Sequence, residues 1–371
     1  MSTPPAPRRD LAAEPEVARL CDAVKSAAAD GRVLMPRGGA TRDAALGAFS
    51  GEPLSLAAYA GILRHTPTEL VVTARAGTPL AALVETLAAA GQRLPFEPAL
   101  PGPEATLGGA VALGTSGPAR AYRAALRDAL LGVTLIDGTG TVCRFGGEVM
   151  KNVAGFDVSR LMAGSYGELG AMLEISLRLE PFPERSQTQA LACTLPEALA
   201  RMPTLASRAG ALSGLAWLGG WLLARFEGSA VEVELGTKAA GGETLPPEDA
   251  AMRWARLREG PLIVEESAEE RAEGDGALWC LSVPNDAPAL ELPDANWALD
   301  WGGARRWVRT TADPGAVAAM LEPHAGHGLR LTPSVLRTPQ PAALRALEQR
   351  VRQAMDPSGV FAHGATPGEE R

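Results

Sequence analysis

Three glycine-rich stretches are the parts of this chain whose residue types and spacing could do chemistry. They read PRGGATRD (36–43), ATLGGAVALGTSG (105–117) and AGSYGELG (163–170). Glycine lets a backbone come close to a ligand, and it adopts the left-handed turns that point consecutive amides at an anion. Any one loop is an ordinary turn in most proteins. Three together, two of them with Ser or Thr beside the glycines, favour a large, extended cofactor that carries a diphosphate.

Other cofactor signatures are missing from the sequence. No GxGxxG follows a predicted strand, so a Rossmann dinucleotide site is not supported. The only lysines are Lys25, Lys151 and Lys238, and none completes a GxxxxGK[ST] phosphate loop. His324 and His327 are spaced as a metal pair, but the glycines around them indicate a loop, and the chain has only 4 histidines. We therefore predict no metal site.

Ser165 lies in AGSYG, which differs by one position from the GxSxG nucleophile elbow of hydrolases. That elbow needs a strand before the serine and a helix after it, whereas Gly167 and Gly170 interrupt any helix here. We interpret Ser165 as a hydrogen-bond donor in a tight turn, and we keep a serine hydrolase as the most distant alternative.

Length and composition are those of an ordinary soluble protein. With 371 residues the chain is long enough for two domains, because single hydrophobic cores rarely grow past about 250–300 residues. The formal net charge of -8 argues against a general nucleic-acid binder, which needs a basic face for phosphate contacts. The 4 cysteines form no CxxC pair, so we expect free thiols in a reducing cytoplasm and no Cys-ligated iron–sulfur cluster.

No segment predicts export or a transmembrane helix. The N-terminal MSTPPAPRRD carries twin arginines but has no apolar run behind them. The longest uncharged run, Ala209 to Ala224, is shorter than the ~20 residues of a membrane span. Because Gly219-Gly220 interrupts it, we interpret the run as two strands joined by a two-residue hairpin turn.

Hydrophobic periodicity predicts the elements that position the loops. In the first half we expect a surface helix over 14–29, a strand over 33–36, a strand and a helix within 69–91, a hairpin over 130–145 and a strand over 172–181. Thr78 is the expected N-cap of the helix within 69–91, with Pro79 at its first position.

The second half is predicted to be a smaller α+β domain that begins after PFPER (181–185). We expect a hairpin over 212–226, the strands ALWCLSV and RRWVRTT, and a helix from Pro314 to Leu321. An amphipathic helix follows within 341–361, and its apolar side consists of Leu344, Leu347, Val351 and Met355.

Five segments spread over nearly the whole chain share one resemblance. They are PTELVVTARAGTPLAALVETLAAAGQRLP (67–95), EATLGGAVALGTSGP (104–118), RFGGEVMKNVAGFDVSRLMAGSYGELG (144–170), DWGGARRW (300–307) and MDPSGVF (355–361). The chain resembles the FAD-binding domain of the vanillyl-alcohol oxidase and p-cresol methylhydroxylase (PCMH) flavoprotein superfamily. More narrowly, it is similar to the FAD-binding subunit of bacterial glycolate oxidases.

The resemblance implies an α+β fold with three parts. A PCMH-type FAD-binding domain of two α/β subdomains is expected over 1–183, and a smaller α+β cap domain over 184–336. A C-terminal helix and tail over 337–371 would return to the FAD domain.

The resemblance also implies which residues bind FAD. The first glycine turn would hold the diphosphate through Arg37, Gly38, Gly39, Ala40 and Thr41. The second loop would lie along the diphosphate and flavin, with Thr106, Gly108, Gly109, Gly114, Ser116 and Gly117. The third segment would wrap the adenine and ribityl side, with Asn152, Val153, Gly155, Asp157, Gly164, Gly167, Gly170 and Ala171.

Two departures from the family pattern bear on these expectations. Many relatives attach the flavin covalently through a His in the first glycine turn, which here reads RGGAT, so we expect noncovalent FAD. Related chains usually continue with Asn-Pro-Gly after DPxGVF, whereas this chain has Ala362-His363-Gly364. That difference weakens any claim that the tail touches the flavin.

The resemblance implies a FAD-binding subunit of a glycolate oxidase complex that acts on a small 2-hydroxy acid. It would pass electrons between a catalytic FAD subunit and an iron–sulfur subunit. We assign no catalytic residue, because we interpret the candidate residues in the second half of the chain as surface residues. These candidates are Arg305, Arg306, Arg330, His324 and His327.

Two alternatives remain for the function. The chain could be a free-standing FAD-dependent 2-hydroxy acid dehydrogenase, or a structural subunit of the complex without bound flavin. We expect a cytoplasmic protein that reaches the inner membrane only through its partners.

Overall fold

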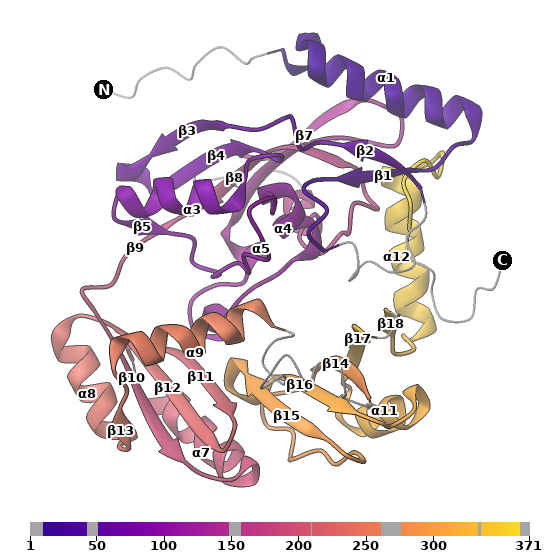
Figure 1. Cartoon of the computed structure of the whole chain (residues 1–371). Helices are drawn as coiled ribbons and strands as arrows, with labels where there is room; N and C mark the ends of the chain where they lie inside the picture. Colours follow the sequence, from indigo (N-terminus) through magenta and orange to yellow (C-terminus); the bar gives the residue numbers. More distant parts are fainter. Residues whose placement is uncertain are drawn as a thin grey trace.

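The computed structural model describes residues 10–42, 51–147, 157–208, 210–260, 276–332 and 335–363. Its elements form two lobes, one above the other in Figure 1. The first lobe holds the described residues up to 181 together with the C-terminal segment 342–363, and the second lobe holds 185–337. The predicted domain limits at 183 and 336 stay predictions.

An antiparallel five-stranded sheet forms the centre of the first lobe, in the order β3-β4-β8-β6-β7. Its strands are β3 (Ile62–Thr66), β4 (Val71–Arg75), β6 (Leu130–Ile136), β7 (Val142–Gly146) and β8 (Ala171–Arg178). The predicted hairpin over 130–145 is confirmed as β6 and β7, and the predicted strand over 172–181 as β8.

Strand β8 is buried on both faces rather than half-exposed as its alternating sequence indicates. Leu177 packs into one hydrophobic core of the lobe and Leu173 into the other. The polar residues between them are satisfied inside the sheet, because Ser176 hydrogen-bonds to Thr73 at 2.8 Å and Glu174 pairs with Arg144 at 3.5 Å. Polar positions in a strand therefore do not mark a solvent face here.

A second, smaller sheet lies beside the five-stranded one. It pairs β1 (Leu34–Arg37) with β2 (Glu52–Ser55) in parallel, under helix α1 (Pro15–Asp30). The predicted helix over 14–29 and the strand over 33–36 are confirmed by α1 and β1. Phe361 forms a bridge with Leu34, so the C-terminal tail returns to this sheet.

The remaining elements of the first lobe are short, and the second and third glycine loops lie among them. They are the helices α3 (Leu80–Ala89), α4 (Leu107–Leu113), α5 (Leu126–Ala129) and α6 (Val158–Leu161), the strands β5 (Gln92–Arg93) and β9 (Glu180–Pro181), and the 3-10 turns Leu11–Ala13, Pro67–Glu69 and Pro118–Ala121. The N-cap prediction for α3 is wrong. Pro79 is the N-cap, because the Thr78 hydroxyl donates instead to the carbonyl of Arg75 at 2.7 Å.

The second lobe is one antiparallel sheet of nine strands, in the order β13-β10-β12-β11-β15-β16-β14-β17-β18. The strands are β10 (Arg185–Ala192), β11 (Leu212–Leu218), β12 (Trp221–Gly228), β13 (Glu243–Thr244), β14 (Ala277–Ser282), β15 (Asn296–Asp300), β16 (Arg305–Thr310), β17 (His327–Arg330) and β18 (Leu336–Arg337). The two-residue turn at Gly219-Gly220 is confirmed, and both glycines have positive φ.

Helices cover the second-lobe sheet. They are α7 (Leu195–Arg208), α8 (Ala230–Ala240), α9 (Pro247–Glu259) and α11 (Pro314–Leu321), with 3-10 turns at Trp301–Gly303 and Glu322–His324. Figure 1 shows α9 along the side of this lobe that faces the first lobe. The Glu259 carboxylate at the end of α9 accepts from the amide of Leu100 at 3.0 Å, so α9 touches the first lobe directly.

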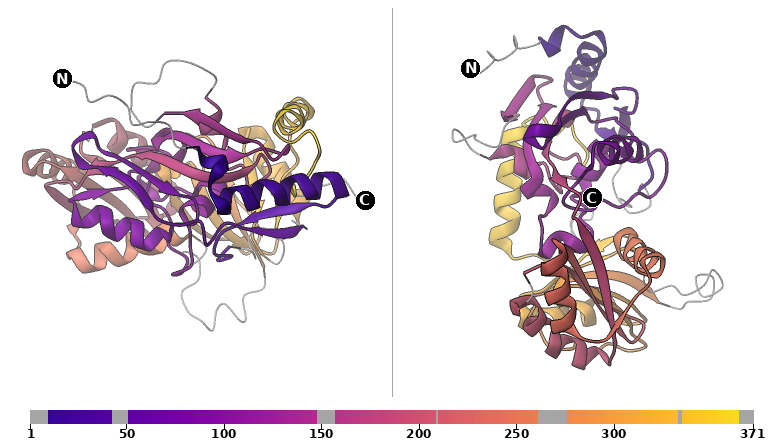
Figure 2. Two further views of the ribbon diagram at one scale, coloured as in Figure 1. Left: turned by 90° about the horizontal axis from the view of Figure 1, so that it is seen from above. Right: turned by 90° about the vertical axis from the view of Figure 1, so that its left-hand side faces the viewer.

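The C-terminal helix α12 (Ala342–Met355) lies alongside the first lobe in Figures 1 and 2. Of its predicted apolar side, Val351 and Met355 pack against the main core. Leu344 and Leu347 are 42% and 53% exposed, because the first half of the helix lies beyond that core, near β18 in Figure 1. Within the described ranges, no helix is long and apolar enough to cross a membrane.

Candidate functional site

The first glycine turn follows β1 and exposes a row of backbone amides. Among the described residues, no hydrogen bond is made by the amides of Gly38, Gly39, Ala40 and Thr41. Ala40 has a φ of 59°, which turns the chain sharply after the strand. Amides left unpaired in such a turn are suited to an anion with several oxygens, such as a diphosphate.

The two glycines of this turn are needed for close packing. A Cβ on Gly38 would lie 2.2 Å from the Thr106 hydroxyl oxygen, and one on Gly39 would lie 1.6 Å from the Glu104 carbonyl oxygen. The first glycine turn is therefore pressed against the start of the second glycine loop. Any side chain at Gly39 would have to push the backbone of that loop away.

The second glycine loop forms α4, and its glycine amides are paired within the protein. The Thr106 hydroxyl caps α4 by accepting from the amide of Gly109 at 3.1 Å. The Gly108 amide donates to the Ala76 carbonyl at 2.7 Å, so α4 is tied to the end of β4. Gly114 ends α4 in a left-handed conformation, where a Cβ would lie 3.0 Å from the Gly164 Cα.

The third glycine loop completes the arrangement by pairing with α4. The amides of Gly164 and Tyr166 donate to the carbonyls of Val111 and Ala112 at 3.0 and 2.8 Å. The Ser165 hydroxyl is buried and donates to the Met162 carbonyl at 2.9 Å. This is the structural role predicted for Ser165, and it does not leave the hydroxyl free as a nucleophile.

A cavity runs between the three loops. Its larger part is lined by residues 36–42, Leu80, Ala99, Pro101, Ala105, Thr106, Gly109, Ala110, Ala112, Leu113, Thr115 and Tyr166. A second part is lined by Leu56, Ala76, Gly108, Gly167, Gly170 and Met172 and shares with the first Pro36, Arg37, Gly38, Thr106, Gly109 and Ala112. Because the two parts share one wall, they form an extended site centred on the first glycine turn.

Arg42 is the functional residue that the sequence reasoning missed. Its side chain lines the larger part of the cavity, and its guanidinium forms no hydrogen bond or salt bridge to any other described residue. Burial lowers the pKa of Arg42, and the Glu259 carboxylate opposes this shift. A partly buried cation with no hydrogen bond or salt bridge to another described residue, next to amides that are also unpaired among those residues, is suited to an anionic ligand. Its position directly after RGGAT was the available signal.

The structure separates the predicted site residues into three sets. Those that line the cavity are Arg37, Gly38, Gly39, Ala40, Thr41, Thr106, Gly108, Gly109, Gly167 and Gly170. Those that lie outside its lining are Gly114, Ser116, Gly117, Asp157, Gly164 and Ala171. The remaining calls, Asn152, Val153 and Gly155, lie outside the described residues.

The members of the second set have other contacts. Ala171 is fully buried in β8, opposite Ile136, and the Ser116 hydroxyl accepts from the Leu126 amide at 3.1 Å. Asp157 pairs with Arg160 at 3.0 Å on the surface. These contacts explain the residue types without a ligand.

The interpretation of Arg305 and Arg306 as surface residues is wrong. Their exposed fractions are 8% and 1%, because Arg306 lies inside the second lobe and Arg305 lies where this lobe meets Ser116 of the first lobe. His327 is exposed at the start of β17, and partial desolvation by the surrounding chain lowers its pKa. No cluster of three or more His, Cys, Asp or Glu side chains suited to a metal occurs in the described part of the chain.

An extended cavity between a small parallel sheet and an antiparallel sheet, with unpaired amides at its centre, is the site of an FAD-binding flavoprotein. Residues 13–146 match the family model described as "FAD binding domain". The cofactor of this chain is FAD, and the unpaired amides and Arg42 fit its anionic diphosphate.

Comparison with curated proteins gives the family. The chain is 40% identical over 316 residues to the glycolate oxidase subunit GlcE of Escherichia coli (strain K12), covering 85% of this chain and 87% of that protein. The chain belongs to the family of this subunit, as its sequence segments indicate. A shorter match, 36% identical over 91 residues, is to the mitochondrial D-lactate dehydrogenase [cytochrome] of Arabidopsis thaliana, covering 24% of this chain and 16% of that protein.

A solved structure supports the fold. An alkyldihydroxyacetonephosphate synthase superimposes with a TM-score of 0.63 at 12% identity, covering 92% of this chain and 74% of that chain. The predicted α+β fold, a PCMH-type FAD-binding domain with a smaller α+β part and a C-terminal helix, is confirmed.

Proposed function

We propose that the chain is the FAD-carrying subunit of a complex that oxidises glycolate, a small 2-hydroxy acid, to glyoxylate. The observation that carries this proposal is the row of amides at Gly38–Thr41, which form no hydrogen bond to another described residue and lie in the wall of the cavity between the glycine loops. The similarity to a glycolate oxidase subunit supports the choice of substrate.

Each part of the site has a separate task in this proposal. FAD, when bound, supplies the acceptor for the hydride that leaves the α-carbon of the acid. The amides of Gly38–Thr41 hold the diphosphate, and Arg42 balances its charge. Gly167 and Gly170 of the third glycine loop line the second part of the cavity, where we place the adenine and ribityl side.

We propose further that the complex contains a catalytic FAD subunit and an iron–sulfur subunit, with this chain passing electrons between them. Such a chain is cytoplasmic and reaches the inner membrane through its partners. The name of the E. coli relative, a subunit, supports assembly with other chains.

The test separates this proposal from its alternatives. The purified chain is mixed anaerobically with glycolate, alone and with its partner subunits, and flavin absorbance is followed. Bleaching that needs the partners supports the complex subunit, whereas bleaching by the isolated chain supports the free-standing dehydrogenase. A chain that carries no flavin under any of these conditions supports the structural subunit.

The attachment of FAD has its own test. The first glycine turn contains no His, so acid precipitation should release all of the flavin into the supernatant. Yellow colour that stays in the protein pellet would contradict noncovalent binding.

A further inference from the structure

The end of the second glycine loop, residues 116–119, is held by side chains of the second lobe. Arg305 donates from Nη1 to the Ser116 carbonyl at 2.8 Å. Trp301 donates from Nε1 to the Gly117 carbonyl at 2.9 Å. Thr115, the residue just before these contacts, lines the cavity. The second lobe therefore contacts the cavity wall through two neighbouring backbone groups.

Arg305 and Trp301 are themselves fixed by a buried cluster. Asp300 is fully buried and accepts two hydrogen bonds from Arg305, one of them from Nε at 2.7 Å. The Trp301 ring lies between two guanidinium groups, with Arg120 at 4.1 Å and Arg305 at 4.0 Å from the ring centroid. Side chains held on several sides cannot move without breaking a charged contact.

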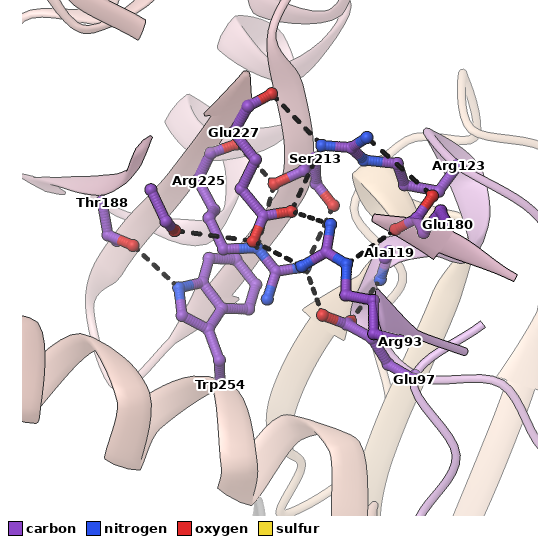
Figure 3. A network of polar contacts seen from close by, with 12 residues as sticks. Arg93, Glu97, Ala119, Arg123, Glu180, Thr188, Ser213, Arg225, Glu227 and Trp254 are labelled. Carbon is purple, nitrogen blue, oxygen red and sulfur yellow. Dashed lines mark hydrogen bonds and ion pairs between the residues drawn. The ribbon is translucent and has the colours of Figure 1, made fainter. Parts of the chain in front are cut away.

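A second contact from the second lobe holds the same loop end. Glu97 accepts from the Ala119 amide at 2.9 Å and pairs with Arg225 of β12 at 2.8 Å. Figure 3 shows Arg225 next to Glu227, which also binds Arg93 at 2.9 Å. Residues 116–119 are thus connected to two strands of the second-lobe sheet, β12 through Glu97 and β16 through Arg305.

Backbone strain is found at these contacts. Glu97 has a φ of 46° and Trp301 a φ of 53°, in the left-handed region that residues other than glycine seldom adopt. Such conformations are unfavourable and persist where the surrounding contacts impose them. Both residues contact this loop end, Glu97 through the Ala119 amide and Trp301 through the Gly117 carbonyl.

We infer that Arg305 is a positioning residue for the flavin site, which, with Trp301, fixes residues 116–119 and thereby connects the second lobe to bound FAD. This inference rests on the proposed function, because it assigns a role toward the flavin. A shift of the second lobe, caused by substrate or by a partner subunit, moves the Ser116 and Gly117 carbonyls and with them the wall at Thr115.

Arg306, the next residue, is a matched control. It is also buried, but among the described residues it donates only to the carbonyls of Gly303, Pro288 and Ala287, all within the second lobe. Burial lowers the pKa of Arg306 to about 10. The two arginines are therefore both buried and lie on the same strand, and they differ in whether they reach the first lobe.

The test uses the full-length chain and three variants. Asp300→Leu with Arg305→Met removes the buried ion pair and its contact to Ser116 without leaving one charge unpaired. Trp301→Phe keeps the ring between the arginines and removes only the hydrogen bond to Gly117. Arg306→Met is the control. FAD affinity is measured by titrating the apoprotein and following flavin fluorescence, and hydrogen exchange is measured for the amides of residues 114–121.

We expect the double variant to weaken FAD binding about tenfold, since the segment next to Thr115 loses a charged hydrogen bond that holds it. Trp301→Phe should weaken it about threefold, because it removes only one neutral hydrogen bond to the same segment. Both should speed exchange at residues 114–121, and Arg306→Met should change neither measurement.

Three results would overturn the inference. One is wild-type FAD affinity and wild-type exchange in the double variant. Another is the same loss of affinity in Arg306→Met, because a general loss of stability would then explain the effect. If the double variant does not fold, Trp301→Phe decides, and unchanged affinity together with unchanged exchange in that variant contradicts the inference.

Failure of the proposed function gives a different result. In that case the wild-type chain itself binds no FAD, but hydrogen exchange in the apoprotein still reports on residues 114–121. Faster hydrogen exchange at residues 114–121 in the double variant than in Arg306→Met would support the inferred connection between the lobes. Equal exchange in the two variants would contradict it.

Discussion

The first and second glycine loops contain similar residues but use their backbones in opposite ways. The amides of Gly38–Thr41 bind nothing in the described protein, whereas Gly108 and Gly109 donate to Ala76 and to the Thr106 hydroxyl. Glycine in the first loop serves a ligand and close packing, and in the second loop close packing alone. A glycine-rich pattern is therefore no measure of ligand contact until the hydrogen bonds of its amides are known.

The largest effect is expected at the point where the two loops touch. Gly39→Val should abolish FAD retention, because the new Cβ would overlap the Glu104 carbonyl and displace the first turn from the second loop. The ratio of flavin to protein absorbance after gel filtration measures this, with Gly210→Ala as control, since nothing lies within 4 Å of a Cβ there. A Gly39→Val chain with stoichiometric FAD would show that the loops do not depend on each other.

A smaller effect is expected at Arg42 of the first loop, where a substitution should weaken ligand binding without lowering stability. Arg42→Gln should weaken FAD binding about ten- to a hundredfold, since it removes a charged contact to the diphosphate. The apoprotein should not lose stability, because Arg42 has no hydrogen-bond or salt-bridge partner within the described ranges. FAD titration and thermal unfolding measure the two quantities, and a destabilised apoprotein with unchanged affinity would refute this role. Arg19→Gln, at an exposed pair with Glu16, is the control.

In the second loop, a substitution should lower stability more than it weakens FAD binding. Thr106→Ala removes the N-cap of α4 and should lower the free energy of unfolding by about 1 kcal/mol. FAD affinity should change less than in Arg42→Gln, because the Thr106 hydroxyl is already paired with Gly109. Thr106→Ser keeps the cap and should restore most of the stability in chemical denaturation. A full loss of FAD in Thr106→Ser would mean that the second loop needs the methyl group for its ligand.

The smallest effect on FAD binding is expected from the ion pairs behind the second loop, which act on stability instead. Burial raises the pKa of Glu227, but the hydrogen bond from Arg93 and the charges of Arg225, Arg93 and Arg123 outweigh it and lower the pKa to about 2. A depressed pKa stabilises the folded state above the unfolded value of 4.5 and loses this contribution as the pH falls toward 2.

The measurement for Glu227 is the unfolding midpoint between pH 6 and pH 2, at about one-unit steps. The wild-type midpoint should fall steeply below pH 4.5, and Glu227→Gln should give a shallower dependence. Parallel curves for the two chains would show that the Glu227 charge does not stabilise this side of the loop.

The sequence predicts those parts of the fold that depend on local pattern. The hairpin at Gly219-Gly220 needs two positive φ angles, which only a glycine pair adopts readily, and α1 has its apolar stripe and a terminal glycine. The N-cap role predicted for Thr78 is wrong because its hydroxyl donates to the carbonyls of Arg75 and Gly61 instead. The local sequence does not show these two contacts.

The site was predictable only where family motifs mark it. RGGAT indicates the first turn, and the position of Arg42 directly after it is the signal for that residue. Nothing in the sequence shows that Gly114 and Gly164 pack against each other. Arg305 looks like a surface residue in RRWVRTT. Its burial depends on Asp300, its cross-strand partner between β15 and β16, and on Ser116 of the first lobe, and the local sequence shows neither contact.

The central claim, that the first glycine turn of this chain holds FAD, is tested most directly by the visible absorption spectrum of the purified chain expressed alone. The account predicts a flavin spectrum at a stoichiometry of about one FAD per chain that survives gel filtration. A folded but colourless chain that gains no flavin spectrum on incubation with FAD would contradict it.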